Sequence, residues 1–142
     1  MSLLSQSTVS NKISISGIGI HTGKKVNLRI LPSSPNSGII FKRVDIKNNN
    51  IVIPNFENVS DATLCTTISN QYGVKVSTIE HLMAAFLGMG IDNAVVELDS
   101  QEVPILDGSA TGFVKFLKET GLKNSDVPIK LIKINNNVEI DE

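Results

Sequence analysis

Alternating apolar and polar positions predict paired strands at the start of the chain. Between residues 9 and 20, isoleucines alternate with serines, a pattern typical of a half-buried strand. Residues 26–30 alternate again after a turn at 22–24, and residues 39–41 follow a Pro-Asn-Ser-Gly turn. We therefore expect a hairpin and a third strand in this region.

Shorter apolar segments continue the pattern through the middle of the chain. Residues 51–53, 64–69 and 74–76 are bounded by turn residues and predict further strands in a meander. Residues 94–98, Ala-Val-Val-Glu-Leu, predict one more strand. The sheet should therefore be mainly antiparallel.

The period of the apolar positions changes after residue 76 and predicts a helix. A stripe with helical spacing runs from Ile79 to Phe86 and stops at Gly88. Ser77 is a suitable N-cap, and Glu80 three residues later completes a capping box. This segment is the first helix that the sequence predicts.

A second helix is expected after the strand at 94–98. Asp107 or Ser109 is predicted to cap it, and Gly121 to end it. Together these patterns predict an α+β fold, in which one sheet of mainly antiparallel strands packs on two helices as a two-layer sandwich.

The last residues are predicted to lie outside this unit. Residues 125–128, Ser-Asp-Val-Pro, are typical of a linker, and residues 129–134 alternate like a new strand. We therefore interpret residues 1–124 as an N-terminal domain. Residues 125–142 are expected to be a linker and the truncated first strand of a second domain.

Composition narrows the class of protein. The 142 residues are 41% hydrophobic and 19% charged, as in globular domains, and the net charge of -1 argues against nucleic acid as a partner. The single cysteine excludes an internal disulfide and is compatible with a reducing compartment. The sequence shows neither a signal peptide nor an apolar run that could span a bilayer. We expect a soluble cytoplasmic protein.

Glu80 and His81 form the strongest candidate for chemistry. Glu80 is either half of the capping box or a general base beside a metal ion. His81 lies in the first helical turn, where the helix dipole favours a neutral, ligating imidazole, although a histidine satisfied by one hydrogen bond is the alternative. The zincin motif is excluded, because position 85, four residues after His81, is alanine.

Two further residues are weaker candidates. His21, in Gly-Ile-Gly-Ile-His-Thr-Gly, is either a polar residue at a hairpin end or part of a site, and the glycines permit a tight turn or a close approach to a ligand. Cys65 is better explained as a small buried residue than as a nucleophile. No local spacing links these residues into the three-ligand set that catalytic zinc usually needs, so the zinc site should be incomplete here.

Four segments in order resemble one family. They are residues 17–23, residues 63–66 (Thr-Leu-Cys-Thr), residues 77–82 (Ser-Thr-Ile-Glu-His-Leu), and residues 91–93 leading to 104–110 (Pro-Ile-Leu-Asp-Gly-Ser-Ala). Together they resemble the UDP-3-O-acyl-N-acetylglucosamine deacetylases, the zinc amidases of lipid A biosynthesis. The resemblance runs from about Ile13 to Leu122, and the shared order is more specific than any single segment.

The resemblance implies an enzyme of two similar α+β domains whose helix layers face each other around the active site. This chain resembles only the first domain. The resemblance implies that Glu80 is the general base and His81 one zinc ligand, and more weakly that His21 and Cys65 line the substrate pocket. The other zinc ligands and the general acid would lie in the C-terminal domain, which is missing here.

The implied reaction is zinc-dependent hydrolysis of the 2-acetamido group of a UDP-linked acylated glucosamine. We expect this chain to be inactive without the second domain. The alternative is a non-catalytic binding or assembly module. We also expect self-association through an apolar helix surface. Its residues would be Met83, Phe86, Phe113 and Phe116.

Overall fold

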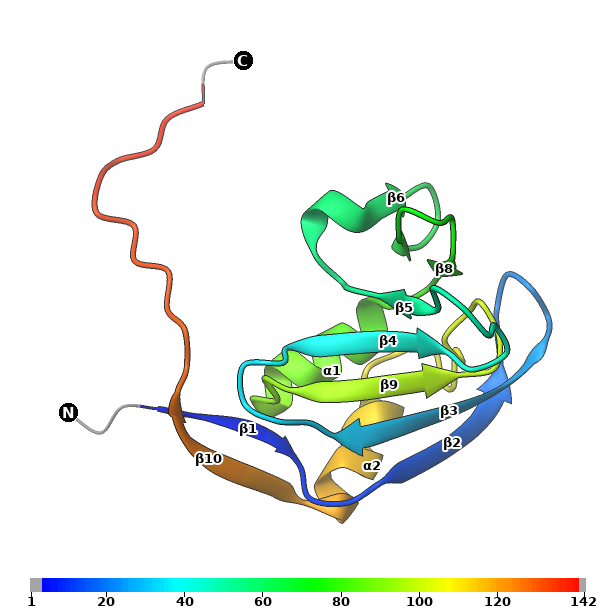
Figure 1. Ribbon diagram of the computed structural model, residues 1–142, viewed down its shortest axis with the longest axis horizontal. Coiled ribbons are helices and arrows are strands. Elements are labelled where there is room, and N and C mark those ends of the chain that lie inside the picture. Colours follow the sequence, from blue (N-terminus) through cyan, green and yellow to red (C-terminus); the bar gives the residue numbers. More distant parts are fainter. Residues whose placement is uncertain (1–3, 141–142) are drawn as a thin grey trace.

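A five-stranded mixed sheet forms the centre of the protein (Figure 1). The computed structural model describes residues 4–140. The sheet has the order β2-β3-β9-β4-β5. Its strands are β2 (Ile13–Ile18), β3 (Lys25–Pro32), β9 (Ala94–Leu98), β4 (Ile39–Arg43) and β5 (Ile51–Val52). The hairpin of β2 and β3 is confirmed, and residues 10–12 separate β2 from an earlier strand, so the single strand predicted for residues 9–20 is wrong.

The position of β9 contradicts the predicted meander. β9 lies between β3 and β4, antiparallel to β3 and parallel to β4. A parallel neighbour needs a long crossover, and the chain between β4 and β9 supplies one that contains the first helix. The sheet is nevertheless mainly antiparallel, as predicted, since the β2–β3, β3–β9 and β4–β5 pairs all run antiparallel.

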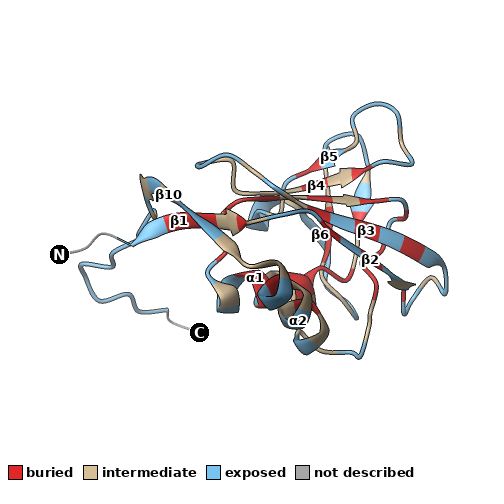
Figure 2. Cartoon of the chain, turned by 90° about the horizontal axis from the view of Figure 1, so that it is seen from below, coloured by how far each residue is buried: buried red, intermediate tan, exposed pale blue. Residues whose placement is uncertain are grey.

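Two helices cover one face of this sheet. α1 (Glu80–Met89) and α2 (Thr111–Thr120) lie on the same side, and Figure 2 shows buried positions where the two layers meet. The alternating residues of β3 that point inward are fully buried, as are one or more side chains of each helix. They include Val26, Leu28, Ile30, Leu82 and Leu117. The predicted two-layer α+β fold is therefore confirmed.

The helix surface expected to be exposed is largely turned into this core. Phe86 is 1% exposed and Phe113 is fully buried, so the prediction is wrong for both. Met83 and Phe116 are half-buried, and Leu87 is instead the large apolar side chain of α1 that is exposed. Within residues 4–140, no helix combines the length and the apolar character needed to cross a membrane.

Two smaller sheets flank the central one. β1 (Ser5–Val9) pairs with β10 (Leu122–Pro128) in an antiparallel ribbon. β6 (Val59–Asp61), β7 (Thr67–Ser69) and β8 (Lys75–Val76) form a three-stranded sheet that follows a 3-10 turn at Phe56–Asn58. The small sheet leads directly into α1 and so brings the segment around Cys65 near the start of that helix.

The predicted linker is part of a strand. Residues 125–128 end β10, because the exposed edge of β1 offers backbone hydrogen bonds that their composition did not reveal. Residues 129–140 have no regular secondary structure and extend away from the body of the protein, so the strand predicted for residues 129–134 is absent (Figure 1). The domain boundary at residue 124 itself stays a prediction.

Candidate functional site

The first turn of α1 is not held by the predicted capping box. The residue before the helix, Ile79, has helical backbone angles and no capping hydrogen bond from its side chain. Ser77 lies in a bridge with Glu102 and its hydroxyl oxygen accepts a hydrogen bond from Thr67 at 3.0 Å. Glu80 Oε2 accepts from the backbone N–H of Thr66 at 3.0 Å instead. Glu80 therefore holds the segment that carries Cys65, not its own helix.

One ring nitrogen of His81 is buried and makes no hydrogen bond to the described residues. The residue as a whole is half-buried, and this nitrogen is Nδ1. A buried polar atom that lacks a partner costs free energy, so this atom fits a group that the described part of the chain does not supply. Residues 4–140 contain no group of three or more His, Cys, Asp and Glu side chains that could hold a metal ion. The unpaired Nδ1 of His81 is a nitrogen of the type that binds a metal ion, but these residues do not supply a complete ligand set by themselves.

His21 and Cys65 line the same cavity. It has a volume of about 400 Å³ and is bounded by the turn between β2 and β3 and by the segment before β7. His21 is exposed, whereas Cys65 is half-buried and its sulfur lies 3.7 Å from the hydroxyl oxygen of Thr67. The structure thus brings two of the four candidates together. Glu80 adjoins them through Thr66, while His81 does not line this cavity.

Glu102 is a site residue that the sequence did not reveal. It is 1% exposed, and its carboxylate accepts hydrogen bonds from His21 N (2.9 Å), Thr22 N (2.8 Å) and Thr78 Oγ1 (3.1 Å). Burial alone would raise the pKa of this carboxyl. The hydrogen bonds from His21, Thr22 and Thr78 outweigh burial, and the pKa of Glu102 lies below its ordinary value of 4.5. In the sequence, the only indication of this role is that Glu102 is a charged residue directly before the apolar residues 103–106.

The glycines before His21 serve contacts within the chain. A Cβ on Gly17 would lie 2.7 Å from Pro104 Cβ, and a Cβ on Gly19 would collide with the Glu102 carboxylate. These two positions therefore need glycine because the β2 end packs closely on residues 102–104. The sequence allowed a tight turn or a close approach to a ligand. At Gly17 and Gly19 the close neighbour is the protein itself, whereas Gly23, with φ 64°, lies in a tight turn in which its N–H donates to Gly19 O.

The remaining motif segments have structural contacts. Asp92 Oδ2 accepts from Ser7 N at 2.7 Å, and Asn93 donates to Gln6 Oε1 at 3.0 Å, so both tie β1 to the end of α1. Ser109 Oγ accepts from the N–H of Thr111 at 3.0 Å, but the residue that precedes α2 is Ala110, whose side chain makes no capping hydrogen bond, so the predicted cap at Asp107 or Ser109 is wrong. None of these residues adjoins the cavity with His21.

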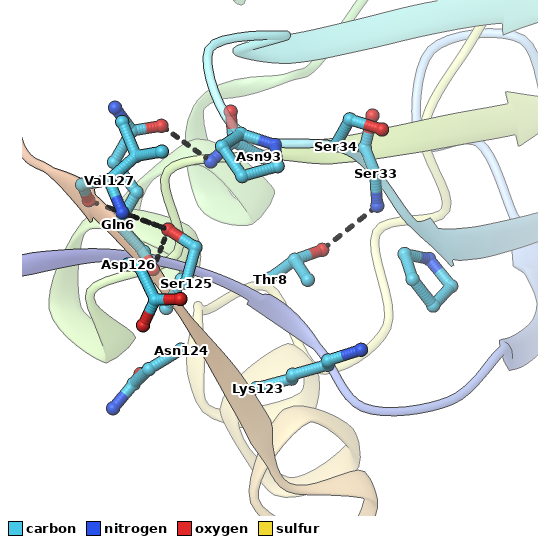
Figure 3. Close-up of a pocket in the computed structure, with 13 residues that line it drawn as sticks. Gln6, Thr8, Ser33, Ser34, Asn93, Lys123, Asn124, Ser125, Asp126 and Val127 are labelled. Carbon is cyan, nitrogen blue, oxygen red and sulfur yellow. Dashed lines mark hydrogen bonds between the residues drawn. The ribbon is translucent and has the colours of Figure 1, made fainter.

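A larger cavity lies elsewhere in the described residues. It measures about 790 Å³ and is lined by β1, β10 and the turn at residues 32–35 (Figure 3). Polar groups around it bond to one another, as Ser33 N does to Thr8 Oγ1 at 3.0 Å. None of the four candidate residues lines it. Its size therefore does not make it the candidate site.

The depressed pKa of Glu102 predicts a pH-dependent effect of its substitution. A carboxyl with a lowered folded pKa stabilises the fold above its ordinary pKa and loses that effect as pH falls through the folded value. Glu102→Gln should therefore cost most at neutral pH, about 1–3 kcal/mol for each buried donor left unpaired. The difference from wild type should shrink in acid below the ordinary pKa of 4.5.

Chemical unfolding of both proteins across this pH range measures the difference. The pKa of Asp45 is also lowered, by hydrogen bonding to Arg43. Because Asp45 is present in both proteins, its contribution to the pH dependence of stability cancels in the difference. If the free energies of unfolding of wild type and Glu102→Gln changed in parallel with pH, the lowered pKa of Glu102 would be contradicted.

Sequence comparisons agree with the motifs found in the chain. The sequence model of the UDP-3-O-acyl N-acetylglycosamine deacetylases matches residues 6–142. The chain is 43% identical over 140 residues to the UDP-3-O-acyl-N-acetylglucosamine deacetylase of Shewanella denitrificans, and 42% and 41% identical to those of Shewanella baltica and Shewanella oneidensis. Each match covers 99% of this chain and 46% of the relative. The chain thus spans about half the length of the curated relatives it matches.

Proposed function

The chain belongs to the UDP-3-O-acyl N-acetylglycosamine deacetylase family, and from this premise we propose that it supplies half of a zinc-dependent amidohydrolase active site. The observation that carries the proposal is the pair at the start of α1. Glu80 is a carboxylate fixed by Thr66, and the adjacent His81 has a buried ring nitrogen without a partner among the described residues. A base beside a metal ligand is an arrangement that metal-assisted hydrolysis of an amide uses.

The proposed zinc would be held by His81 together with donors outside this chain. Bound zinc would polarise the amide carbonyl and lower the pKa of a water molecule. Glu80 would accept the proton of that water, and the bond from Thr66 N–H keeps one of its oxygens in place for this role.

The proposed substrate is a UDP-linked 3-O-acylated N-acetylglucosamine, which loses acetate from its 2-acetamido group. The relatives carry the name of this deacetylase, which supports the same reaction for the complete protein here. The cavity with His21 and Cys65 would form part of the substrate site. We place the enzyme in the cytoplasm, and the free thiol of Cys65 supports a reducing compartment.

A chimera tests this proposal. The 142-residue chain is fused to the segment of the Shewanella denitrificans relative that its match leaves uncovered, and acetate release is measured with and without zinc. The chimera should bind about one zinc and hydrolyse the substrate, whereas either part alone should be inactive. A His81→Ala chimera is the matched control and should lose zinc.

Two results would contradict the proposal. One is tight, stoichiometric zinc on the 142-residue chain alone, because the ligand set would then be complete without a second part. The other is a folded, zinc-loaded chimera that does not release acetate, which would favour the non-catalytic module.

Self-association stays a prediction, and the exposed Leu87 replaces Phe86 and Phe113 as its candidate contact.

A further inference from the structure

Glu102 joins the two segments that carry the candidate chemistry. Its Oε1 accepts from both His21 N and Thr78 Oγ1, and its Oε2 accepts from Thr22 N. Thr78 lies two residues before Glu80. One buried carboxylate therefore links the turn that bears His21 to the start of α1.

The segment around Glu102 is itself fixed to both partners. Ser77 N donates to Gln101 O at 2.8 Å, and Val103 N donates to Ser77 O at 3.0 Å. On the other side, Ile105 N donates to Ile18 O at 3.0 Å. Glu102 thus lies on a short bridge of backbone hydrogen bonds between β2 and the residues before α1.

The charge of Glu102 is balanced by dipoles. The ion pairs of the described residues join Arg29 and Lys42 to Glu97, and Arg43 to Asp45, and do not include Glu102. Hydrogen bonds from backbone N–H groups and hydroxyls favour an ionised carboxylate. Because such bonds require fixed donor directions, the carboxylate also fixes the two segments that supply the donors.

Thr78 has a conformation that needs such support. Its φ is 58°, in the left-handed region, where a β-branched residue is a genuine outlier. The side chain is almost fully buried, and its hydroxyl donates to Glu102. Strained backbone of this kind persists where surrounding contacts hold it, and Thr78 lies two residues before the first residue of α1.

We propose that Glu102 is a positioning residue, which fixes His21 relative to the Glu80–His81 pair by binding the His21–Thr22 turn and Thr78 together. The inference rests on the proposed function, because the placement of these groups affects a rate only if they act on one substrate. A displacement of about 1 Å in such a site can lower the rate about 100-fold.

The link itself is tested on the 142-residue chain by NMR hydrogen exchange. Thr78→Val removes the hydroxyl but keeps the branched shape, and should lower protection of the His21 and Thr22 amides at least about tenfold, equivalent to about 1.4 kcal/mol. Thr78→Ser should restore it. Glu102→Gln should lower protection of the same amides further, and by more than the uniform decrease that its loss of stability gives the β3–β9 amides. Glu97→Gln, which alters a carboxylate on the sheet, is the matched control.

The exchange experiment tests the link through Glu102 independently of whether the complete enzyme is active. Unchanged His21 and Thr22 protection in Thr78→Val would overturn the link, whether or not the complete enzyme deacetylates. If Glu102→Gln does not fold, the Thr78→Val and Thr78→Ser pair still decides. An inactive wild-type chimera with the expected exchange pattern would instead count against the proposed function.

The effect on the reaction is measured in the active chimera. Thr78→Val should lower kcat with little change in KM or zinc content, and Thr78→Ser should recover it. Glu102→Gln should lower kcat by about 100-fold, the loss expected from misplacement. A loss of kcat that only follows the fraction of folded protein would overturn the positioning role.

Discussion

Substituting Glu80 by Gln in the zinc-loaded chimera is expected to lower kcat by about 10²–10⁴-fold, the usual contribution of a general base. Gln cannot accept the proton of water, yet its amide oxygen can still accept the hydrogen bond from Thr66 N. The local structure should therefore persist, and zinc content should stay near that of the parent. Steady-state kinetics together with metal analysis of the same sample measure both quantities.

Glu119→Gln is the matched control for this substitution. Glu119 is exposed on α2, outside the proposed site. Its substitution replaces a carboxylate by an amide, as Glu80→Gln does. It should leave kcat within about twofold of the parent, since exposed substitutions usually have small effects. If Glu80→Gln reduced only the stability and left kcat intact, Glu80 would merely anchor the Thr66 segment.

Phe86→Ala should cost the 142-residue chain about 3–5 kcal/mol of unfolding free energy. Phe86 is 1% exposed, and its ring fills the layer between α1 and the sheet, so truncation leaves a cavity in the core. The loss is a large part of the 5–15 kcal/mol by which most domains are stable. Urea unfolding followed by far-UV circular dichroism measures it.

The next residue in the same helix provides the control. Leu87 is 84% exposed, so Leu87→Ala removes a similar apolar side chain without opening a cavity and should change stability by about 0.5 kcal/mol or less. Equal losses for the two variants would show that Phe86 does not pack as described.

Local sequence patterns predicted the elements better than their partners. The alternation in β3 and the stripe of α1 are properties of neighbouring residues, and both elements are present, whereas the alternation in β2 predicted a strand that was too long. The insertion of β9 between β3 and β4 depends on contacts between residues far apart, for which alternation carries no signal. The ribbon of β1 and β10 was missed for the same reason.

The predicted capping box does not form, because Ser77 and Glu80 make contacts with residues distant in the sequence instead of with each other. Ser77 and Glu80 have the correct spacing, but the backbone of Ser77 pairs with residues 101–103, and Glu80 reaches Thr66. The Glu80–His81 pair could be found because the two residues are adjacent. The meeting of His21 with Cys65 was implied only by family resemblance, and Glu102, bonded to a turn about 80 residues away, was not found.

The ribbon at the edge of the molecule also constrains how the protein is made. Ser5 pairs with Pro128, so β1 leaves the ribosome well before its partner strand has been synthesised. Contacts between such distant residues form late and slow the search for the native state. Until then the buried Gln6 and Val9 are uncovered, and a nascent chain stalled before residue 122 would be a natural client for chaperones.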